Sequence, residues 1–278
     1  MTSRLRTLGA ADRDAALSFL AKRPVENLFL TSKVGAYGID RRRLGVVHAF
    51  ERDGEITSLL LDGGTVFVAG FDPDALPAFV AELGPLRRCT SILGPAISVL
   101  GLFVGLSERW PGAWGSISNV RRRQPLMVLD APPAVEPDPR VRLLTHSDFP
   151  SYLEASVSMY TDEIGSSPFK YGPGYDRFVT ERLRQRDAYG IVDDDGRVIF
   201  KADLGPKHGN QAQLQGVWVA PDLRGRGLSV PALAGMLRLA MERYPVISLY
   251  VNDFNAPAIA SYERLGFVEV GALATVHY

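Results

Sequence analysis

The feature that most constrains this chain is an arginine- and glycine-rich turn between an apolar strand and a helix, at residues 217–229. The segment opens with Val-Trp-Val-Ala-Pro-Asp-Leu and ends with Arg-Gly-Arg-Gly-Leu-Ser. The first N–H groups of a helix have no partner within the helix, and such an end binds phosphate groups. Gly225 and Gly227 let the backbone approach an anion closely, and the two arginines add positive charge. The segment therefore predicts a phosphate-binding strand–loop–helix unit.

A second motif lies further along the chain and strengthens this interpretation. It consists of Asn255-Ala-Pro-Ala258, then Tyr262, then Gly266-Phe267. Together the two segments resemble the GNAT (GCN5-related N-acetyltransferase) superfamily, whose phosphate loop reads Arg/Gln-x-x-Gly-x-Gly/Ala. The loop here matches at Arg224 and Gly227 and departs from the pattern at Ser229, a residue small enough to let a pyrophosphate approach.

The resemblance implies that the loop holds the pyrophosphate of acetyl-CoA. His48, His146 and His277 have no metal-ligand spacing, so no metal is expected. In the family, the strand before the loop diverges from its neighbour, and its backbone pairs with the pantetheine arm. The side chain of Trp218 could equally be core packing. The residues implied to bind the cofactor are Val217, Trp218, Val219, Arg224, Gly225, Arg226, Gly227, Leu228, Ser229, Asn255, Ala258 and Tyr262.

The resemblance also implies a general acid. Tyr262 lies one helical turn after Ala258, and its phenol would protonate the departing coenzyme A sulfur. A tyrosine with an ordinary pKa of ~10 is protonated at neutral pH and can donate. The alternative is a buried tyrosine whose hydroxyl is satisfied by a backbone group.

The sequence does not single out one residue as the general base. Many relatives carry a Glu on the strand equivalent to residues 211–219, where this chain has only Gln213 and Gln215. Either water relays the proton, or another residue accepts it. Other elements offer three carboxylates and an imidazole: Glu163, Asp203, the terminal carboxylate of Tyr278, and His208. Glu163 is the preferred catalytic candidate because relatives bind acceptors between their first two helices.

A run of closely spaced prolines divides the chain into two parts. Residues 131–140 contain closely spaced prolines and predict an extended linker between domains at 1–130 and 141–278. The second part has the order β-α-α-β-β-β-α-β-α-β-β, with its last strands at 267–270 and 274–278. The predicted fold class is α/β (α+β): a tandem GNAT-like fold with a mixed, mostly antiparallel central sheet flanked by helices.

The N-terminal part repeats this order coarsely and is similar to the poorly characterised domain that precedes GNAT domains in actinobacterial proteins. After its strand at 65–70 the chain reads Phe71-Asp-Pro-Asp74 instead of an Arg/Gly loop. Two carboxylates there would repel a pyrophosphate. We therefore expect a degenerate copy that does not bind coenzyme A; an unrelated α/β domain is the alternative.

Composition narrows the function further. The 278 residues carry 31 basic and 31 acidic side chains, which argues against a nucleic-acid-binding protein. A single cysteine, Cys89, and an N-terminus without an apolar leader favour a cytoplasmic protein. The apolar run 92–106 is shorter than the ~20 residues of a membrane span.

The resemblance thus implies an acetyl-CoA-dependent N-acetyltransferase that works by direct attack of the acceptor amine in a ternary complex. The acceptor is a small-molecule or protein amine, and a homodimer is compatible with the sequence. Two alternatives stay open: a non-catalytic acyl-CoA-binding regulatory module, and a tandem-fold aminoacyl or other acyl transferase.

Overall fold

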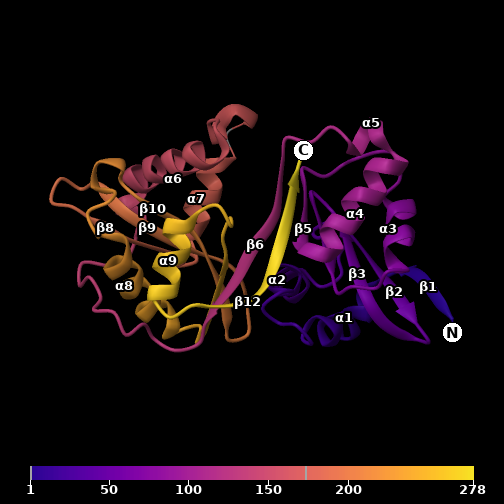
Figure 1. Ribbon diagram of the computed structural model, residues 1–278. Helices are drawn as coiled ribbons and strands as arrows, with labels where there is room; N and C mark the ends of the chain where they lie inside the picture. The colour runs from indigo at the N-terminus through magenta and orange to yellow at the C-terminus, as the bar shows by residue number, and fades with distance from the viewer. Residues whose placement is uncertain (1, 173) are drawn as a thin grey trace. The chain divides into compact units, whose positions relative to one another are not determined.

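The computed structural model describes residues 2–172 and 174–278, which divide into two compact units (Figure 1). Unit 1 comprises Met1–Met127, Tyr250–Asn255 and Glu269–Tyr278. Unit 2 comprises Val128–Leu249 and Ala256–Val268. Each unit is a mixed sheet with helices on its faces, as the sequence predicts.

Unit 1 is built on a sheet in the order β1-β2-β3-β4-β5-β12-β6, in which β4 and β5 run parallel. Its strands are β1 (Ser3–Thr7), β2 (Val46–Arg52), β3 (Glu55–Asp62), β4 (Thr65–Ala69), β5 (Ser91–Pro95), β6 (Asn119–Leu129) and β12 (Val268–His277). Its helices are α1 (Arg13–Leu20), α2 (Leu28–Tyr37), α3 (Ala75–Leu83), α4 (Ala96–Arg109) and α5 (Pro111–Trp114). Two apolar clusters form its core, one around α1 and α2 and the other around α3 and α4.

The C-terminal strand lies where the sequence did not place it. We expected 267–270 and 274–278 to close the sheet of a domain spanning 141–278. Instead β12 is one continuous strand that pairs antiparallel with β5 of unit 1, with Thr275 opposite Leu93. The buried side chains of Leu273, Ala274 and Val276 explain this, because they complete the two apolar clusters of unit 1. Unit 2 also begins at Val128, before the predicted linker at 131–140.

Unit 2 has a sheet in the order β11-β10-β9-β8-β7, antiparallel except for the pair β10 and β11. Its strands are β7 (Arg142–Leu143), β8 (Ala188–Val192), β9 (Val198–His208), β10 (Gln211–Val219) and β11 (Val246–Tyr250). Its helices are α6 (Phe149–Ile164), α7 (Tyr175–Arg184), α8 (Ser229–Met241) and α9 (Ala256–Arg264). The predicted order of these elements is confirmed.

Alternation along the strands assigns the helices of unit 2 to opposite faces of its sheet. Tyr152 of α6 donates a hydrogen bond to Asp203 of β9 (2.8 Å). The neighbouring Ala202 lies opposite Tyr189, whose hydroxyl contacts Arg243 just after α8 (3.5 Å). Side chains that point to α6 therefore alternate with side chains that point to α8. Asp203 therefore lies on the α6 face of β9, and Lys201, two positions before it, shares that face.

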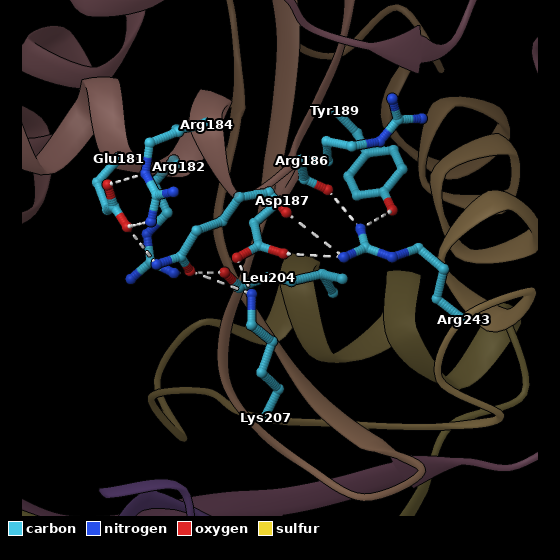
Figure 2. Close-up of polar contacts among 10 residues, drawn as sticks. Glu181, Arg182, Arg184, Arg186, Asp187, Tyr189, Leu204, Lys207 and Arg243 are labelled. Carbon is cyan, nitrogen blue, oxygen red and sulfur yellow. Dashed lines mark hydrogen bonds and ion pairs between the residues drawn. The ribbon is translucent and has the colours of Figure 1, made fainter. Parts of the chain in front are cut away.

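A polar cluster around Asp187 holds the turn between α7 and β8 (Figure 2). The Asp187 side chain is fully buried and forms ion pairs with Lys207 and with Arg243 (3.6 Å). Arg243 also donates to the carbonyl of Arg186 (2.5 Å), a residue in the left-handed region at φ 57°. These contacts tie α7, β9 and the end of α8 together and give the cluster a structural role.

Candidate functional site

The loop before α8 has the geometry of an anion site. Gly225 and Gly227 have φ of +74° and +79°, in the left-handed region that favours glycine. Within the described part of the chain, no backbone hydrogen bond takes up the N–H groups of Gly225, Arg226 or Gly227. Ser229 begins α8, whose first N–H groups lack intrahelical partners. The loop therefore presents a run of free donors at a helix N-terminus.

The two loop arginines differ in their surroundings. The guanidinium of Arg224 donates to the carbonyl of Val219 (3.0 Å) and to Asp162 at the end of α6 (2.7 Å). These bonds fasten the loop to β10 and α6 and partly neutralise the charge of Arg224. Arg226 is exposed and, with Gly227, lines a hollow of about 530 Å³ beside the loop. Of the two, Arg226 is the better placed to meet a phosphate.

The strand before the loop has an open edge. Strands β10 and β11 pair in register only from Gln211 opposite Val246 to Gln213 opposite Ser248. Although β10 continues to Val219 and β11 to Tyr250, the described residues show no pairing in register after Gln213. The backbone of β10 beyond Gln213 is therefore available on that side, and the resemblance implies a strand that diverges from its neighbour here.

A β-bulge interrupts β10 beside this open edge. The register with β9 passes from Gln215 opposite Asp203 to Trp218 opposite Lys201, so β10 carries one extra residue. Gly216, at φ +63°, occupies the bulge, and its carbonyl accepts a hydrogen bond from Lys201 Nζ (3.0 Å). Lys201 also pairs with Asp203 (2.5 Å).

Tyr262 and Glu163 lie within electrostatic reach of each other. Only 9% of Tyr262 is exposed, and burial raises its pKa to about 12, with the negative charge of Glu163 adding to the effect. Among the described residues, no hydrogen bond takes up the Tyr262 hydroxyl, so the alternative of a backbone-satisfied tyrosine finds no support. Glu163 likewise contributes to the raised pKa of Tyr175 on α7. The charge of one exposed carboxylate thus acts on two buried or half-buried phenols.

The three other candidate bases named from the sequence have different surroundings. The Asp203 carboxylate is buried and accepts hydrogen bonds from Tyr152 and Lys201. His208 is exposed at the hairpin where it lies opposite Gln211, at the end of β10 remote from the phosphate loop. Tyr278 belongs to unit 1, where its ring packs against Trp114 and the guanidinium of Arg87. Of the candidates in unit 2, Glu163 is the one whose charge contributes to the raised pKa of Tyr262.

The remaining residues predicted to bind the cofactor lie on β10, just before α8, and at or near α9. Val217 and Val219 lie on β10, and Leu228 precedes α8. Trp218 is 8% exposed, and among the described residues its indole N–H has no hydrogen-bond partner. Ala258 lies on α9 in unit 2, whereas Asn255 is grouped with unit 1 and donates its backbone N–H to Asn252 (2.9 Å).

Unit 1 has a different arrangement at the start of α3, its counterpart to the phosphate loop. Asp72 is buried, and a hydrogen bond from Arg52 (2.7 Å) is the main cause of its lowered pKa. The same carboxylate accepts from Thr57 (2.9 Å) and from the backbone N–H of Asp74 (3.0 Å). Carboxylates therefore occupy the place that a phosphate would take, as the sequence predicted for a degenerate copy.

The sequence interpretation missed Lys201, Tyr152 and Gly216. The signal was a Lys and an Asp two positions apart in the otherwise apolar stretch 198–204, a spacing that puts both on one face of a strand. In the part of the chain that the structure describes, no cluster of potential metal ligands occurs. The same residues include no helix long and apolar enough to cross a membrane.

Two family models match different parts of the chain. Residues 153–267 match the acetyltransferase (GNAT) family model, and residues 45–152 match a domain of unknown function (DUF4081). A mycothiol acetyltransferase of Saccharomonospora viridis is 26% identical over 170 residues, which cover 55% of this chain and 56% of that protein. The chain thus aligns with about half the length of this curated relative.

Solved structures share the fold. A GCN5-related N-acetyltransferase from Sphaerobacter thermophilus superposes with a TM-score of 0.63 at 15% identity, covering 99% of this chain and 95% of that one. A tandem GNAT protein from the clavulanic acid biosynthesis pathway gives 0.55 at 14% identity, covering 100% and 98%. These likenesses confirm the predicted tandem GNAT-like fold. Residues 153–267 of this chain thus form a domain that matches the GNAT acetyltransferase family.

Proposed function

We propose that this protein is an acetyl-CoA-dependent N-acetyltransferase in which the acceptor amine attacks the thioester directly. One observation carries the proposal: unit 2 combines free backbone donors at the N-terminus of α8 with an open edge on β10. The loop would hold the pyrophosphate, chiefly through its N–H groups and Arg226. The β10 edge at Val217 and Val219 would pair with the pantetheine arm.

Two side chains would move the protons. Acetyl-CoA, when bound, supplies the acetyl group and a thiolate leaving group. Glu163 accepts a proton from the acceptor amine as its nitrogen bonds to the carbonyl carbon, directly or through one water. Tyr262 donates its phenolic proton to the sulfur as the carbon–sulfur bond breaks. With its pKa at about 12, Tyr262 stays protonated across the neutral range.

The acceptor is proposed from the comparisons. The curated relative is named a mycothiol acetyltransferase, so a small-molecule amine is our preferred acceptor over a protein amine. A non-catalytic acyl-CoA-binding module is the second candidate, because β10 carries Gln213 and Gln215 where relatives have a Glu. Turnover with any amine separates the two candidates.

We expect one molecule of acetyl-CoA to bind per chain. The loop of unit 2 has free N–H donors, whereas Asp72 and Asp74 fill the corresponding place in unit 1 and would repel an anion. Isothermal titration calorimetry with acetyl-CoA measures the stoichiometry. A value of two would contradict a degenerate unit 1, and no binding would contradict the proposed function.

We expect Glu163→Gln to lower kcat/KM about 10²-fold, the low end for a general base, because water can replace part of an exposed carboxylate. Acetyl-CoA affinity should be unchanged. Free coenzyme A released with a panel of small primary amines measures the rate. Glu154→Gln removes another exposed carboxylate of α6 and serves as the control. Equal rates for both variants would show that Glu163 is not the base.

A further inference from the structure

Four aromatic side chains gather where α6 adjoins α7 in unit 2 (Figure 1). They are Tyr160 of α6, Phe169 of the 3-10 helix Pro168–Tyr171, and Tyr175 and Phe178 of α7. The Tyr175 ring is their centre, with centroid distances of 5.5 Å to Tyr160 and 6.1 Å to Phe169. Phe178 stacks on the same ring at 5.9 Å. All three distances suit favourable ring contacts, and we call the four residues the aromatic cluster.

The aromatic cluster is fastened to α6 and to the sheet of unit 2. The Tyr175 hydroxyl donates a hydrogen bond to the carbonyl of Ser156 on α6 (3.0 Å). The guanidinium of Arg182 lies 4.7 Å from the centre of the Phe178 ring. The same guanidinium donates to the carbonyl of Leu204 on β9 (2.6 Å). The rings are therefore positioned by polar contacts as well as by one another.

The packing of α7 does not account for the outer rings of the cluster. This helix buries Val179 and Leu183, whereas 47% of the adjacent Phe178 is exposed. Phe169 is exposed to a similar extent, at 41%. Single exposed apolar side chains are ordinary on protein surfaces, but neighbouring ones that form a patch mark a place that binds an apolar group.

The aromatic cluster adjoins the two residues proposed to move protons. Glu163 follows Tyr160 by three positions on α6, a spacing that puts both side chains on one side of the helix with their Cβ atoms about 5–6 Å apart. The negative charge of Glu163 contributes to the raised pKa of Tyr175 in the cluster and to that of Tyr262. A carboxylate suited to an amine therefore lies beside rings suited to an apolar group.

We propose that the aromatic cluster selects the acceptor, and that the acceptor is a primary amine with an aromatic ring two carbons from its nitrogen. The inference rests on the proposed function, because it needs Glu163 as the base that receives the amine. A carboxylate and the faces of aromatic rings both attract the ammonium form in which such amines arrive. The acceptor ring would pack against the exposed parts of Phe169 and Phe178. A two-carbon link suits the short separation of Tyr160 and Glu163.

The test compares two acceptors, 2-phenylethylamine and 2-aminoethanol, which differ in carrying a ring or a hydroxyl at the same carbon. Release of coenzyme A from acetyl-CoA measures both rates. In the wild-type protein, kcat/KM should be at least roughly 10-fold higher for 2-phenylethylamine. Phe169→Ala and Phe178→Ala should each lower this ratio roughly 2- to 10-fold, the value of one aromatic contact. The loss should appear mainly as a higher KM for the aromatic amine.

Phe71→Ala is the matched control, because Phe71 is 45% exposed but belongs to unit 1. It should retain the wild-type ratio of the two acceptors. Phe178→Leu keeps an apolar side chain without the ring and should also lower the ratio; it replaces Phe178→Ala if that variant does not fold. Calorimetry with acetyl-CoA verifies that each variant is folded.

The outcomes separate the inference from the proposed function. Equal kcat/KM for the two amines in the wild-type protein, or a wild-type ratio in both cluster variants, would overturn the role of the aromatic cluster even though an amine is acetylated. A wild-type protein that releases coenzyme A with no primary amine would overturn both. Sedimentation velocity gives the oligomeric state. A wild-type dimer that becomes a monomer in Phe178→Ala would assign the cluster to a contact between two copies of the chain and would overturn the inference.

Discussion

Tyr262→Phe is expected to lower turnover by roughly 10²–10⁴-fold, the usual contribution of a well-placed general acid. Acetyl-CoA affinity should change little, because the phenolic proton is needed only when the sulfur leaves. The structure gives the physical reason: the side chain is 9% exposed and its pKa is raised to about 12. Its hydroxyl is not taken up by another described residue.

The measurement is the rate of coenzyme A release, with acetyl-CoA affinity determined separately by calorimetry. Tyr189→Phe is the control, because it deletes the hydroxyl of another buried tyrosine of unit 2 whose pKa burial also raises. That variant should turn over at nearly the wild-type rate. If Tyr262→Phe did the same, water or another group would have to protonate the sulfur.

The pH dependence follows from the direction of the Tyr262 shift. Burial and the charge of Glu163 both disfavour the phenolate, so the acid form persists as the pH rises through the ordinary tyrosine range toward 12. Loss of activity at moderately alkaline pH should therefore not originate from Tyr262. In Glu163→Gln, the second cause of the shift is absent, and the Tyr262 pKa should move down from about 12.

Most elements of unit 2 could be predicted because each is determined by residues that lie close together in the sequence. The Arg/Gly loop depends on neighbouring residues, and so does the helix that follows it, which the structure has from Ser229 to Met241. In unit 1, β1 and the helix α2 had no comparable signal. α2 buries Leu28, Leu30, Thr31 and Val34, a set without a clear apolar stripe in the sequence.

Features that depend on distant contacts could not be read in this way. β12 belongs to unit 1 because it pairs with β5, which is far away in the chain. The residues of β12 alone do not indicate which strand it pairs with. The Lys201–Asp203 pair was visible as a pattern, but its contact with Gly216 depends on a bulge that shifts the register of β10. Asp203 was therefore taken as a candidate base, although its carboxylate is already occupied by Tyr152 and Lys201.

Gly227→Val is expected to weaken acetyl-CoA binding roughly 10- to 100-fold, the loss of a hydrogen bond to a charged phosphate group. Gly227 has φ +79°, a conformation that a β-branched residue rarely adopts, and an added Cβ would meet nothing within 4 Å. The expected damage is therefore to the backbone conformation that aims the N–H groups, and a larger side chain would also stand where the pyrophosphate must approach.

Gly54→Val is the matched control, because Gly54 has φ +87° and equally open surroundings but lies in a hairpin of unit 1. Both variants carry a similar backbone strain, so their melting temperatures should fall by similar amounts. Only Gly227→Val should lose acetyl-CoA affinity, measured by calorimetry on the folded proteins. A folded Gly227→Val protein with wild-type affinity would mean that the pyrophosphate is held elsewhere, because the donors of this loop cannot keep their direction when the left-handed residue is replaced.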